Sequence, residues 1–232
     1  MNWTEFPDRS ALVAGVARCV QEQLEDCLAA RPEASIALAG GGTPMPIYAS
    51  LAATAVDWSR VTAVATDERW VPARHAAHNG GQISRQFAGA GLRVANLVPE
   101  DAQGQANPRQ AEQSLAGMPG PFDLVLVGMG DDAHFASLFP HSAALRVGLD
   151  PAAAVDVLVV MPDPLPPEAP FARISLSLSK LLDTRRLLLV ITGQGKRAVL
   201  KQAARAQADE QALPIAALLR AAGEKLEIFW SP

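Results

Sequence analysis

Apolar residues recur at helical spacing near the start of the chain. Between positions 10 and 30, one face of a helix would carry Leu12, Val13, Val16, Val20, Leu24 and Leu28. Pro32 follows this segment. Proline lacks the amide proton that a helix interior needs, and it disfavours helix in the residue before it. The pattern therefore predicts a helix over residues 10–30.

The rest of the chain contains short continuous runs of apolar residues, in which apolar and polar positions do not alternate. They predict strands at residues 35–39, 61–66, 122–127, 155–160, 174–178, 187–191 and 226–229. Segments of helical spacing between them predict helices after Pro44 and at residues 82–87, 194–206 and 215–222. Continuous apolar strands are typical of parallel sheets that are covered on both faces. The alternation therefore predicts an α/β fold with a Rossmann-like open, mainly parallel sheet and helices on both faces.

The length of 232 residues suits one such unit, so we expect residues 1–232 to form a single domain. The proline-rich stretch at residues 161–170 has the composition of a linker. Because the strand pattern resumes directly after it, we interpret this stretch as a rigid loop within the domain.

Composition and charge exclude several classes of protein. The chain has 20 Lys and Arg against 24 Asp and Glu with no basic run, which argues against a nucleic-acid partner but leaves a small anionic ligand open. No apolar stretch approaches the ~20 residues of a membrane span, and the first residues do not resemble a signal peptide. Cys19 and Cys27 would lie about 12 Å apart along one helix, too far for a disulfide. We expect a cytoplasmic protein that contacts no membrane.

Three polar motifs directly follow apolar strands, where ligands bind in parallel α/β sheets. The first is the glycine run at residues 40–42 with Thr43 and Pro44. Glycines let the backbone approach an anion closely, and the N–H groups of the next helix start favour negative charge. The same residues also suit an ordinary strand-to-helix turn in which Thr43 caps the helix.

The second motif places Asp67, Glu68 and Arg69 at the end of the strand at 61–66. Charges at a strand exit must be solvated or paired, so a surface ion pair is the ordinary interpretation. Alternatively, the planar donor fork of Arg69 would hold an oxyanion or a phosphate. Asn79, further along, would orient substrate hydroxyls or form a turn.

The third motif begins with glycines at 128 and 130 and continues to Asp132 and His134. A histidine beside a carboxylate can act as a base near neutral pH, although a capping aspartate and a structural histidine also fit. Arg173 and Lys196 are isolated cations that are ordinarily solvated. Together with a glycine loop, they would make a phosphate cradle.

In this order, these segments resemble the 6-phosphogluconolactonase family. The resemblance runs through residues 38–44, 67–72, 79, 128–140, 173–176, 192–197 and 228–230 and so covers nearly the whole chain. It implies the Rossmann-like fold shared by glucosamine-6-phosphate deaminase, ribose-5-phosphate isomerase and CoA transferases. It also implies hydrolysis of 6-phospho-D-glucono-1,5-lactone to 6-phosphogluconate in the oxidative pentose phosphate pathway, without a metal or an organic cofactor.

The resemblance also assigns roles to residues. His134 is implied as the base that activates water, Asp132 as its partner, and Arg69 as the group that stabilises the oxyanion or grips the substrate. Binding of the substrate and its phosphate is implied for Gly41, Gly42, Thr43, Asp67, Asn79, Arg173 and Lys196. The partner is then a small sugar-phosphate lactone, and the chain is a monomer or a homodimer.

One position departs from the family pattern. The family usually has Asp-Gly-His where this chain has Ala133 between Asp132 and His134. If the backbone there needs a positive φ, alanine adds strain of about 1 kcal/mol or more and can shift the histidine. In a helical or extended backbone, alanine is harmless.

Two other functions stay open. An amino-sugar-phosphate isomerase or deaminase would continue its histidine motif with Asn-Glu-Pro, whereas this chain has Ser-Leu-Phe-Pro at 137–140. A sugar-phosphate-binding protein without catalysis has Ala133 as its only support. Ser137 is a poor candidate for a serine nucleophile, because the Gly-x-Ser-x-Gly pattern is absent.

Overall fold

The computed structural model describes residues 2–165, 169–205 and 207–232. Its strands are β1 (Asn2–Glu5), β2 (Ala34–Leu38), β3 (Val61–Ala65), β4 (Asp67–Arg69), β5 (Arg93–Ala95), β6 (Leu124–Val127), β7 (Val157–Val160), β8 (Arg173–Leu176), β9 (Leu187–Thr192) and β10 (Leu226–Ser231). Its α-helices are α1 (Arg9–Ala30), α2 (Met45–Ala52), α3 (Asn79–Gln86), α4 (Arg109–Ala116), α5 (Leu145–Gly148), α6 (Leu178–Leu182), α7 (Gln194–Ala203) and α8 (Ile215–Ala222).

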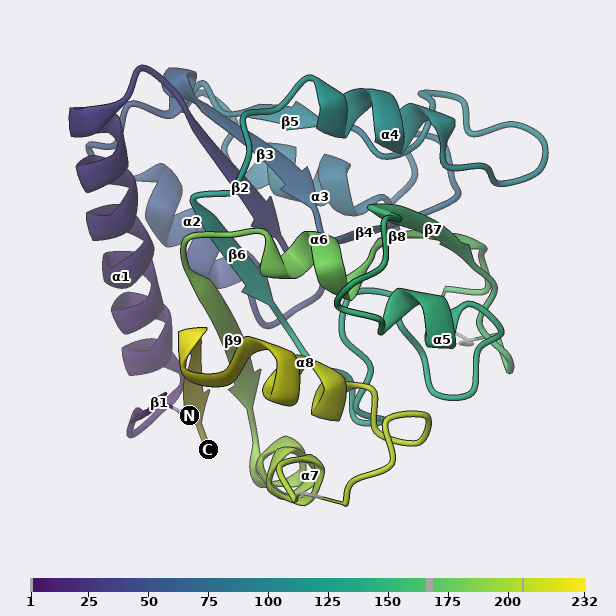
Figure 1. Ribbon diagram of the computed structural model, residues 1–232. Coiled ribbons are helices and arrows are strands. Elements are labelled where there is room, and N and C mark those ends of the chain that lie inside the picture. Colours follow the sequence, from purple (N-terminus) through teal and green to yellow (C-terminus); the bar gives the residue numbers. More distant parts are fainter. Residues whose placement is uncertain (1, 166–168, 206) are drawn as a thin grey trace.

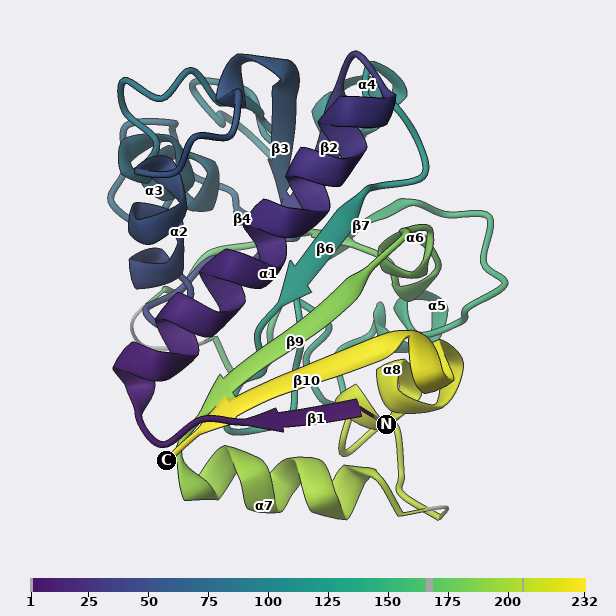
Figure 2. The ribbon, with the colours of Figure 1, turned by 90° about the vertical axis from the view of Figure 1, so that its left-hand side faces the viewer.

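A parallel sheet of seven strands forms the centre of the fold, in the order β1-β10-β9-β6-β2-β3-β5. Helix α1 covers one face of this sheet, and α6 and α8 lie on the other (Figures 1 and 2). Every residue of β2 and of β6 is buried, as expected for strands covered on both sides. The predicted open parallel sheet with helices on both faces is confirmed.

A second, antiparallel sheet of three strands corrects part of this prediction, because its order is β4-β8-β7. The apolar runs at 155–160 and 174–178 suggest strands of the main sheet. Strand β8 lies between β4 and β7 and is buried throughout. An apolar run reveals burial but not the direction of the neighbouring strand. Strand β4 follows β3 directly, where the sequence suggests only a charged loop.

Other elements carry little signal in the sequence. The edge strands β1 and β5 and the helix α4 are short and largely exposed, and the sequence analysis does not predict them. The helix expected at 194–206 ends at Ala203, and residue 206 lies outside the described residues. Residues 166–168 of the proline-rich stretch also lie outside them, so its interpretation as a rigid loop stays a prediction.

Cys19 and Cys27 are both buried on α1 as free thiols. Burial raises the pKa of Cys19 to about 11, which keeps the thiol protonated and poorly reactive at neutral pH.

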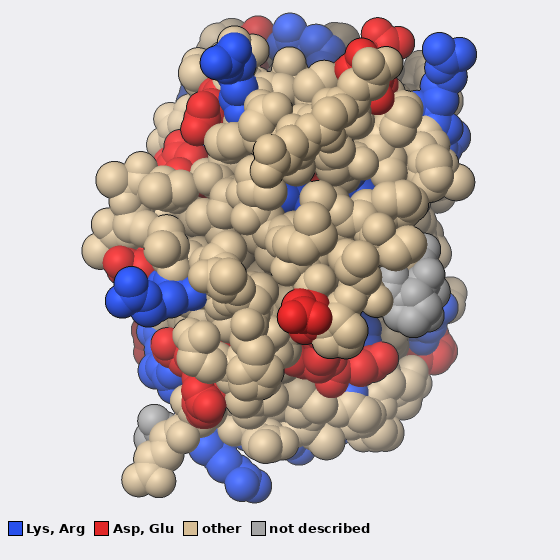
Figure 3. Space-filling model, turned by 90° about the vertical axis from the view of Figure 1, so that its right-hand side faces the viewer, with Lys and Arg blue, Asp and Glu red and all other residues tan. Residues whose placement is uncertain are grey.

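Basic and acidic side chains both occur on the face of the molecule shown in Figure 3. On the face that carries β7 and α5, Lys and Arg lie mostly singly around the margin (Figure 3). Within residues 2–165, 169–205 and 207–232, none of the helices combines the length and the apolar character that crossing a membrane requires.

Arg60 ties the end of α1 to the sheet. Its Nε donates to the carbonyl of Pro32 (2.8 Å), and its Nη2 donates to those of Leu28 (2.8 Å) and Arg31 (2.6 Å). A cation at a helix C-terminus satisfies carbonyls that have no partner within the helix. We expect Arg60→Ala to lower the free energy of unfolding by about 1–2 kcal/mol in urea denaturation.

Arg93→Ala is the matched control, since its ion pair with Glu33 spans 3.5 Å between exposed side chains. Exposed pairs contribute little, so this variant is expected to change stability by less than about 0.5 kcal/mol. Equal effects of the two substitutions would contradict the role given to Arg60.

Candidate active site

A cavity of about 220 Å³ lies at the carboxyl ends of β2, β3, β6 and β9. All three sequence motifs reach it. The candidate residues that line it are Gly41, Gly42, Thr43, Asp67, Arg69, Asn79, His134 and Lys196. Parallel strands bring segments from distant parts of the chain to one edge, which is why these residues meet.

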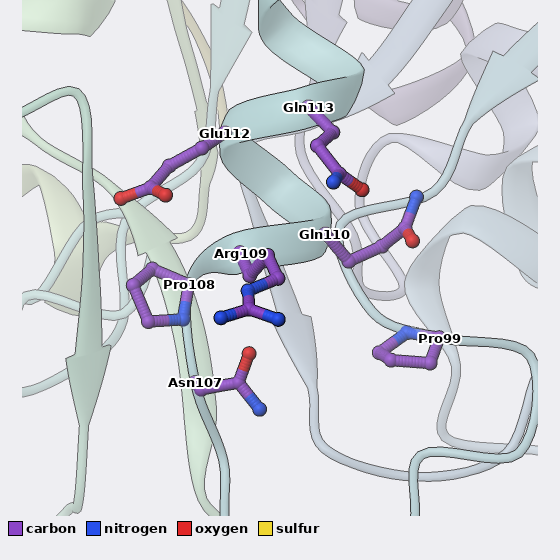
Figure 4. A pocket seen from close by; sticks show the side chains of 7 residues that line it. All are labelled: Pro99, Asn107, Pro108, Arg109, Gln110, Glu112 and Gln113. Atoms are coloured by element: carbon purple, nitrogen blue, oxygen red, sulfur yellow. The ribbon is translucent and has the colours of Figure 1, made fainter.

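A larger open hollow of about 630 Å³ surrounds the start of α4. Figure 4 shows that its side chains include Asn107, Arg109 and Gln110, and none of the candidate site residues lines it. The described ranges contain no group of three or more His, Cys, Asp and Glu arranged to hold a metal ion. The candidate chemistry therefore lies in the smaller cavity.

His134 and Asp132 form a pair at the cavity wall. The Nδ1 atom of His134 lies 2.5 Å from the Oδ1 atom of Asp132. Burial opposes ionisation of Asp132, but the hydrogen bonds and the charge of His134, together with backbone hydrogen bonding, lower the pKa of Asp132 below its ordinary value. A carboxylate on Nδ1 favours the tautomer that leaves Nε2 able to accept a proton. The ring of Phe139 packs against His134 with centroids 4.3 Å apart.

Gly130 makes room for this pair. A Cβ atom at position 130 would lie 2.3 Å from the His134 ring and 2.5 Å from the Asp132 carboxylate, so only glycine fits. The N–H of Gly130 also donates to the carbonyl of His134 at 2.8 Å, which closes the turn. The glycine is visible in the sequence, but the close approach that requires it is not.

Ala133 has φ of +67°, in the region that glycine prefers. The strain anticipated for a positive φ therefore applies, at about 1–2 kcal/mol. Two features stabilise this conformation. The side chain of Ala133 is fully buried, and the carbonyl of Ala133 accepts a hydrogen bond from the N–H of Ile215 at 3.0 Å. His134 stays paired with Asp132, so alanine does not displace the histidine.

The glycine loop also lines the cavity, at the carboxyl end of β2. Gly41 has φ of +97°, which explains glycine at that position. Pro44 is the N-cap residue of α2 and no side chain caps the helix, so the alternative role of Thr43 as its cap is wrong. A contact that the sequence does not suggest comes from Arg9, whose Nη2 donates to the carbonyl of Gly42 at 2.8 Å.

Arg69 faces the cavity with its guanidinium held from one side. Its Nη1 donates to the carbonyl of Ala77 (2.7 Å) and to the Oδ1 of Asn79 (2.8 Å). Asn79 is buried, and its Nδ2 donates to the carbonyl of Asp67 at 2.8 Å. Among the described residues, no acceptor pairs with the buried Nε of Arg69. Asn79 thus fixes Arg69. Because both polar atoms of its amide are engaged, Asn79 is less free to orient a substrate.

Asp67 is buried, and its Oδ2 accepts a hydrogen bond from the hydroxyl of Ser137 at 2.5 Å. Ser137 does not line the cavity, and this bond occupies its hydroxyl proton. The side chain therefore braces Asp67 and is unsuited to nucleophilic attack.

The two isolated cations behave differently. Lys196, in the first turn of α7, lines the cavity, whereas Arg173 does not. The Nη1 and Nη2 atoms of Arg173 donate to the carbonyls of Phe171 (2.6 Å) and Ala169 (2.7 Å). Burial lowers the pKa of Arg173 to about 10. The structure thus brings Lys196, but not Arg173, to the glycine loop.

Comparison with known proteins gives consistent matches over the whole chain. The family profile described as glucosamine-6-phosphate isomerases/6-phosphogluconolactonase matches residues 7–230. A 6-phosphogluconolactonase of Pseudomonas putida is 38% identical over 231 residues, covering 98% of this chain and 92% of the relative. One from Rhizobium meliloti (strain 1021) is 36% identical over 236 residues, covering 100% and 99%. The crystal structure of a 6-phosphogluconolactonase from Shewanella baltica OS155 superposes with a TM-score of 0.90 at 32% identity, covering 100% and 98%.

Proposed function

Because the chain belongs to the glucosamine-6-phosphate isomerase/6-phosphogluconolactonase family, we propose that it hydrolyses 6-phospho-D-glucono-1,5-lactone to 6-phosphogluconate. It is an enzyme of the hydrolase class. The observation that supports this reaction best is the His134–Asp132 pair, which can act as a base. The same cavity also holds a glycine loop and Lys196, which suit an anion. A base and an anion cradle in one cavity suit a lactone that also carries a phosphate.

The lactone carbonyl reacts with a water molecule that His134 activates. Nε2 of His134 takes a proton as the water oxygen bonds to the carbonyl carbon, and the negative charge develops on the carbonyl oxygen. The ring C–O bond then breaks, and the leaving ring oxygen receives the proton from His134. A lactone is an activated ester, so no covalent nucleophile is needed.

Arg69 supplies the charge that stabilises the oxyanion. Its guanidinium is fixed before the substrate arrives, and a preorganised donor of this kind is commonly worth about 10²–10³ in rate. Asp132 orients His134 through Nδ1. Asn79 contributes by holding Arg69, in place of the direct role toward substrate hydroxyls that the sequence suggests.

The phosphate binds on Gly41, Gly42 and Thr43, with Lys196 as its cation. Because none of these groups takes part in the proton transfer, phosphate binding can serve to place the carbonyl at the base. Because Arg173 donates to backbone carbonyls and does not line the cavity, we assign it no contact with the phosphate.

Replacing Lys196 by alanine tests this division of roles. We expect KM for the lactone to rise about 10- to 100-fold with kcat within threefold, because a charge-assisted bond to phosphate contributes about 1.5–3 kcal/mol to binding. Initial rates over a range of lactone concentrations measure both constants. Lys201→Ala on the exposed side of α7 is the control and is expected to leave both unchanged. A fall in kcat alone for Lys196→Ala would place the lysine at the reacting carbon instead.

The reaction itself is tested by a comparison of substrates. Freshly prepared 6-phosphogluconolactone, the unphosphorylated gluconolactone and glucosamine 6-phosphate are each mixed with the wild-type protein. We expect acceleration of the phosphorylated lactone far above the other lactone, and no ammonium from glucosamine 6-phosphate. Release of ammonium without lactone opening would replace this proposal with the amino-sugar-phosphate deaminase.

The same proposal covers the organisation of the chain. One cluster of buried apolar side chains includes members from both the first and the last helix, which supports a single domain over residues 1–232. Two free buried thiols are compatible with action in the reducing cytoplasm.

A further inference from the structure

Glu68 is a charged residue of strand β4 to which the proposed chemistry gives no role. Its side chain is 1% exposed and does not line the cavity. A buried carboxylate is costly unless hydrogen bonds compensate for the water it loses. The contacts of Glu68 therefore indicate what the carboxylate does.

Three backbone N–H groups donate to this carboxylate. Oε1 accepts from the N–H of Arg69 (2.8 Å) and of Asn79 (2.7 Å), and Oε2 accepts from that of Gly80 (2.7 Å). Asn79 and Gly80 are the first residues of α3, where N–H groups have no partner within the helix. The carboxylate thus fastens the start of α3 to β4.

His78 adds no charge to this arrangement. Its Nδ1 lies 3.3 Å from Oε2 of Glu68, but burial lowers the pKa of His78 to about 4, so the ring is neutral near pH 7. Burial also raises the pKa of Glu68 to about 7, while the three N–H donors favour the ionised form. The backbone bonds, rather than an ion pair with His78, therefore stabilise the carboxylate.

The fastened segment carries both acceptors that hold Arg69. These are the carbonyl of Ala77 and the Oδ1 of Asn79, each bonded to Nη1. Gly40 leaves room for the amide of Asn79, since a Cβ atom at position 40 would lie 2.1 Å from Oδ1. The direction of the Arg69 guanidinium is thus set by residues that Glu68 keeps in place.

We propose that Glu68 is a positioning residue that aims Arg69 into the cavity by tying residues 77–80 to β4. The part of this inference that concerns catalysis rests on the proposed role of Arg69 at the oxyanion. The geometric part stands independently of the reaction.

Glu68→Gln tests the inference with a side chain of the same shape. The remaining oxygen can still accept from Arg69 and Asn79, but the new NH2 group faces the N–H of Gly80, so two donors oppose each other. We expect kcat for lactone opening to fall about 10- to 100-fold with KM within threefold. This fall in kcat does not exceed the fall of about 10²- to 10³-fold that accompanies removal of an entire oxyanion donor. Glu227→Gln, which breaks a pair with Arg186 at the start of β10, is the control and is expected to leave kcat unchanged.

A double-mutant cycle separates positioning from stability. In an Arg69→Ala background, Glu68→Gln is expected to change kcat by less than about twofold, because the group that Glu68 aims is absent. A tenfold loss that persists in this background would overturn the inference. Glu68→Asp, which keeps the charge on a shorter side chain, replaces Glu68→Gln if that variant does not fold.

A second readout does not depend on the reaction. In ¹⁵N-labelled protein, the Nε–Hε resonance of Arg69 is assigned by its loss in Arg69→Ala. We expect Glu68→Gln to shift or broaden this resonance and Glu227→Gln to leave it in place. An unchanged resonance would overturn the inference, whereas absence of lactone opening by the wild type would overturn the proposed function and the catalytic part of the inference but not its geometric part.

Discussion

His134→Ala is expected to lower kcat for lactone opening by about 10²–10⁴-fold while KM stays within threefold. Among the described residues that line the cavity, the His134 imidazole is the one side chain that forms an ion pair with a carboxylate. A positioned base contributes rate in this range. Because the phosphate cradle is separate, loss of the ring leaves binding nearly intact. Initial rates, with the spontaneous reaction subtracted, measure both constants.

His141→Asn is the matched control for this substitution. His141 is exposed, and its φ of +59° is tolerated by asparagine. We expect wild-type rates from it. Asp132→Asn is expected to lower kcat less than His134→Ala, by about 10- to 100-fold, because the base itself remains and only the charge of its half-exposed partner is lost. If His134→Ala kept more than a third of the wild-type kcat, His134 would not be the base.

Gly40→Ala is expected to lower kcat/KM about 100-fold although residue 40 takes no part in the chemistry. The new methyl carbon would lie 2.1 Å from Oδ1, 2.4 Å from Cγ and 2.7 Å from Nδ2 of Asn79. That amide is held on both sides, by Arg69 and by the carbonyl of Asp67. Relieving the overlap must therefore move Arg69, and an overpacked site also loses about 1–3 kcal/mol of stability.

Kinetics and thermal melting of Gly40→Ala and Gly117→Ala measure these effects. The methyl at position 117 would meet only ordinary contacts of 3.6 Å and beyond, so this control is expected to behave as the wild type. In an Asn79→Ala background the methyl has room, and Gly40→Ala is expected to cost little more. Equal losses with and without the Asn79 amide would show that the overlap with Asn79 is not the cause.

Much of the fold is predictable because its central strands are continuous apolar runs. Strands β2, β6 and β9 were expected within one or two residues of their observed bounds, since burial on both faces leaves a clear pattern. The small sheet of β4, β8 and β7 was not foreseen, because strand direction depends on tertiary pairing that a run of apolar residues does not encode.

The site is predictable from the sequence where the type of residue by itself indicates a chemical role. The sequence pointed to the motif of His134 and to the glycine loop, and both reach the cavity. The sequence does not distinguish Lys196 from Arg173, because each is an isolated cation next to a strand. Only the folded structure shows that the guanidinium of Arg173 donates to nearby backbone carbonyls. The roles of Gly40 and Gly130 depend on close approaches between distant segments, which no local pattern shows.

The most direct test of the proposed function is the rate at which freshly generated 6-phosphogluconolactone disappears with and without the wild-type protein. We expect a loss that rises in proportion to protein concentration, exceeds the spontaneous reaction and yields 6-phosphogluconate. A folded protein that binds 6-phosphogluconate but does not accelerate this loss would contradict it and identify a sugar-phosphate-binding protein instead.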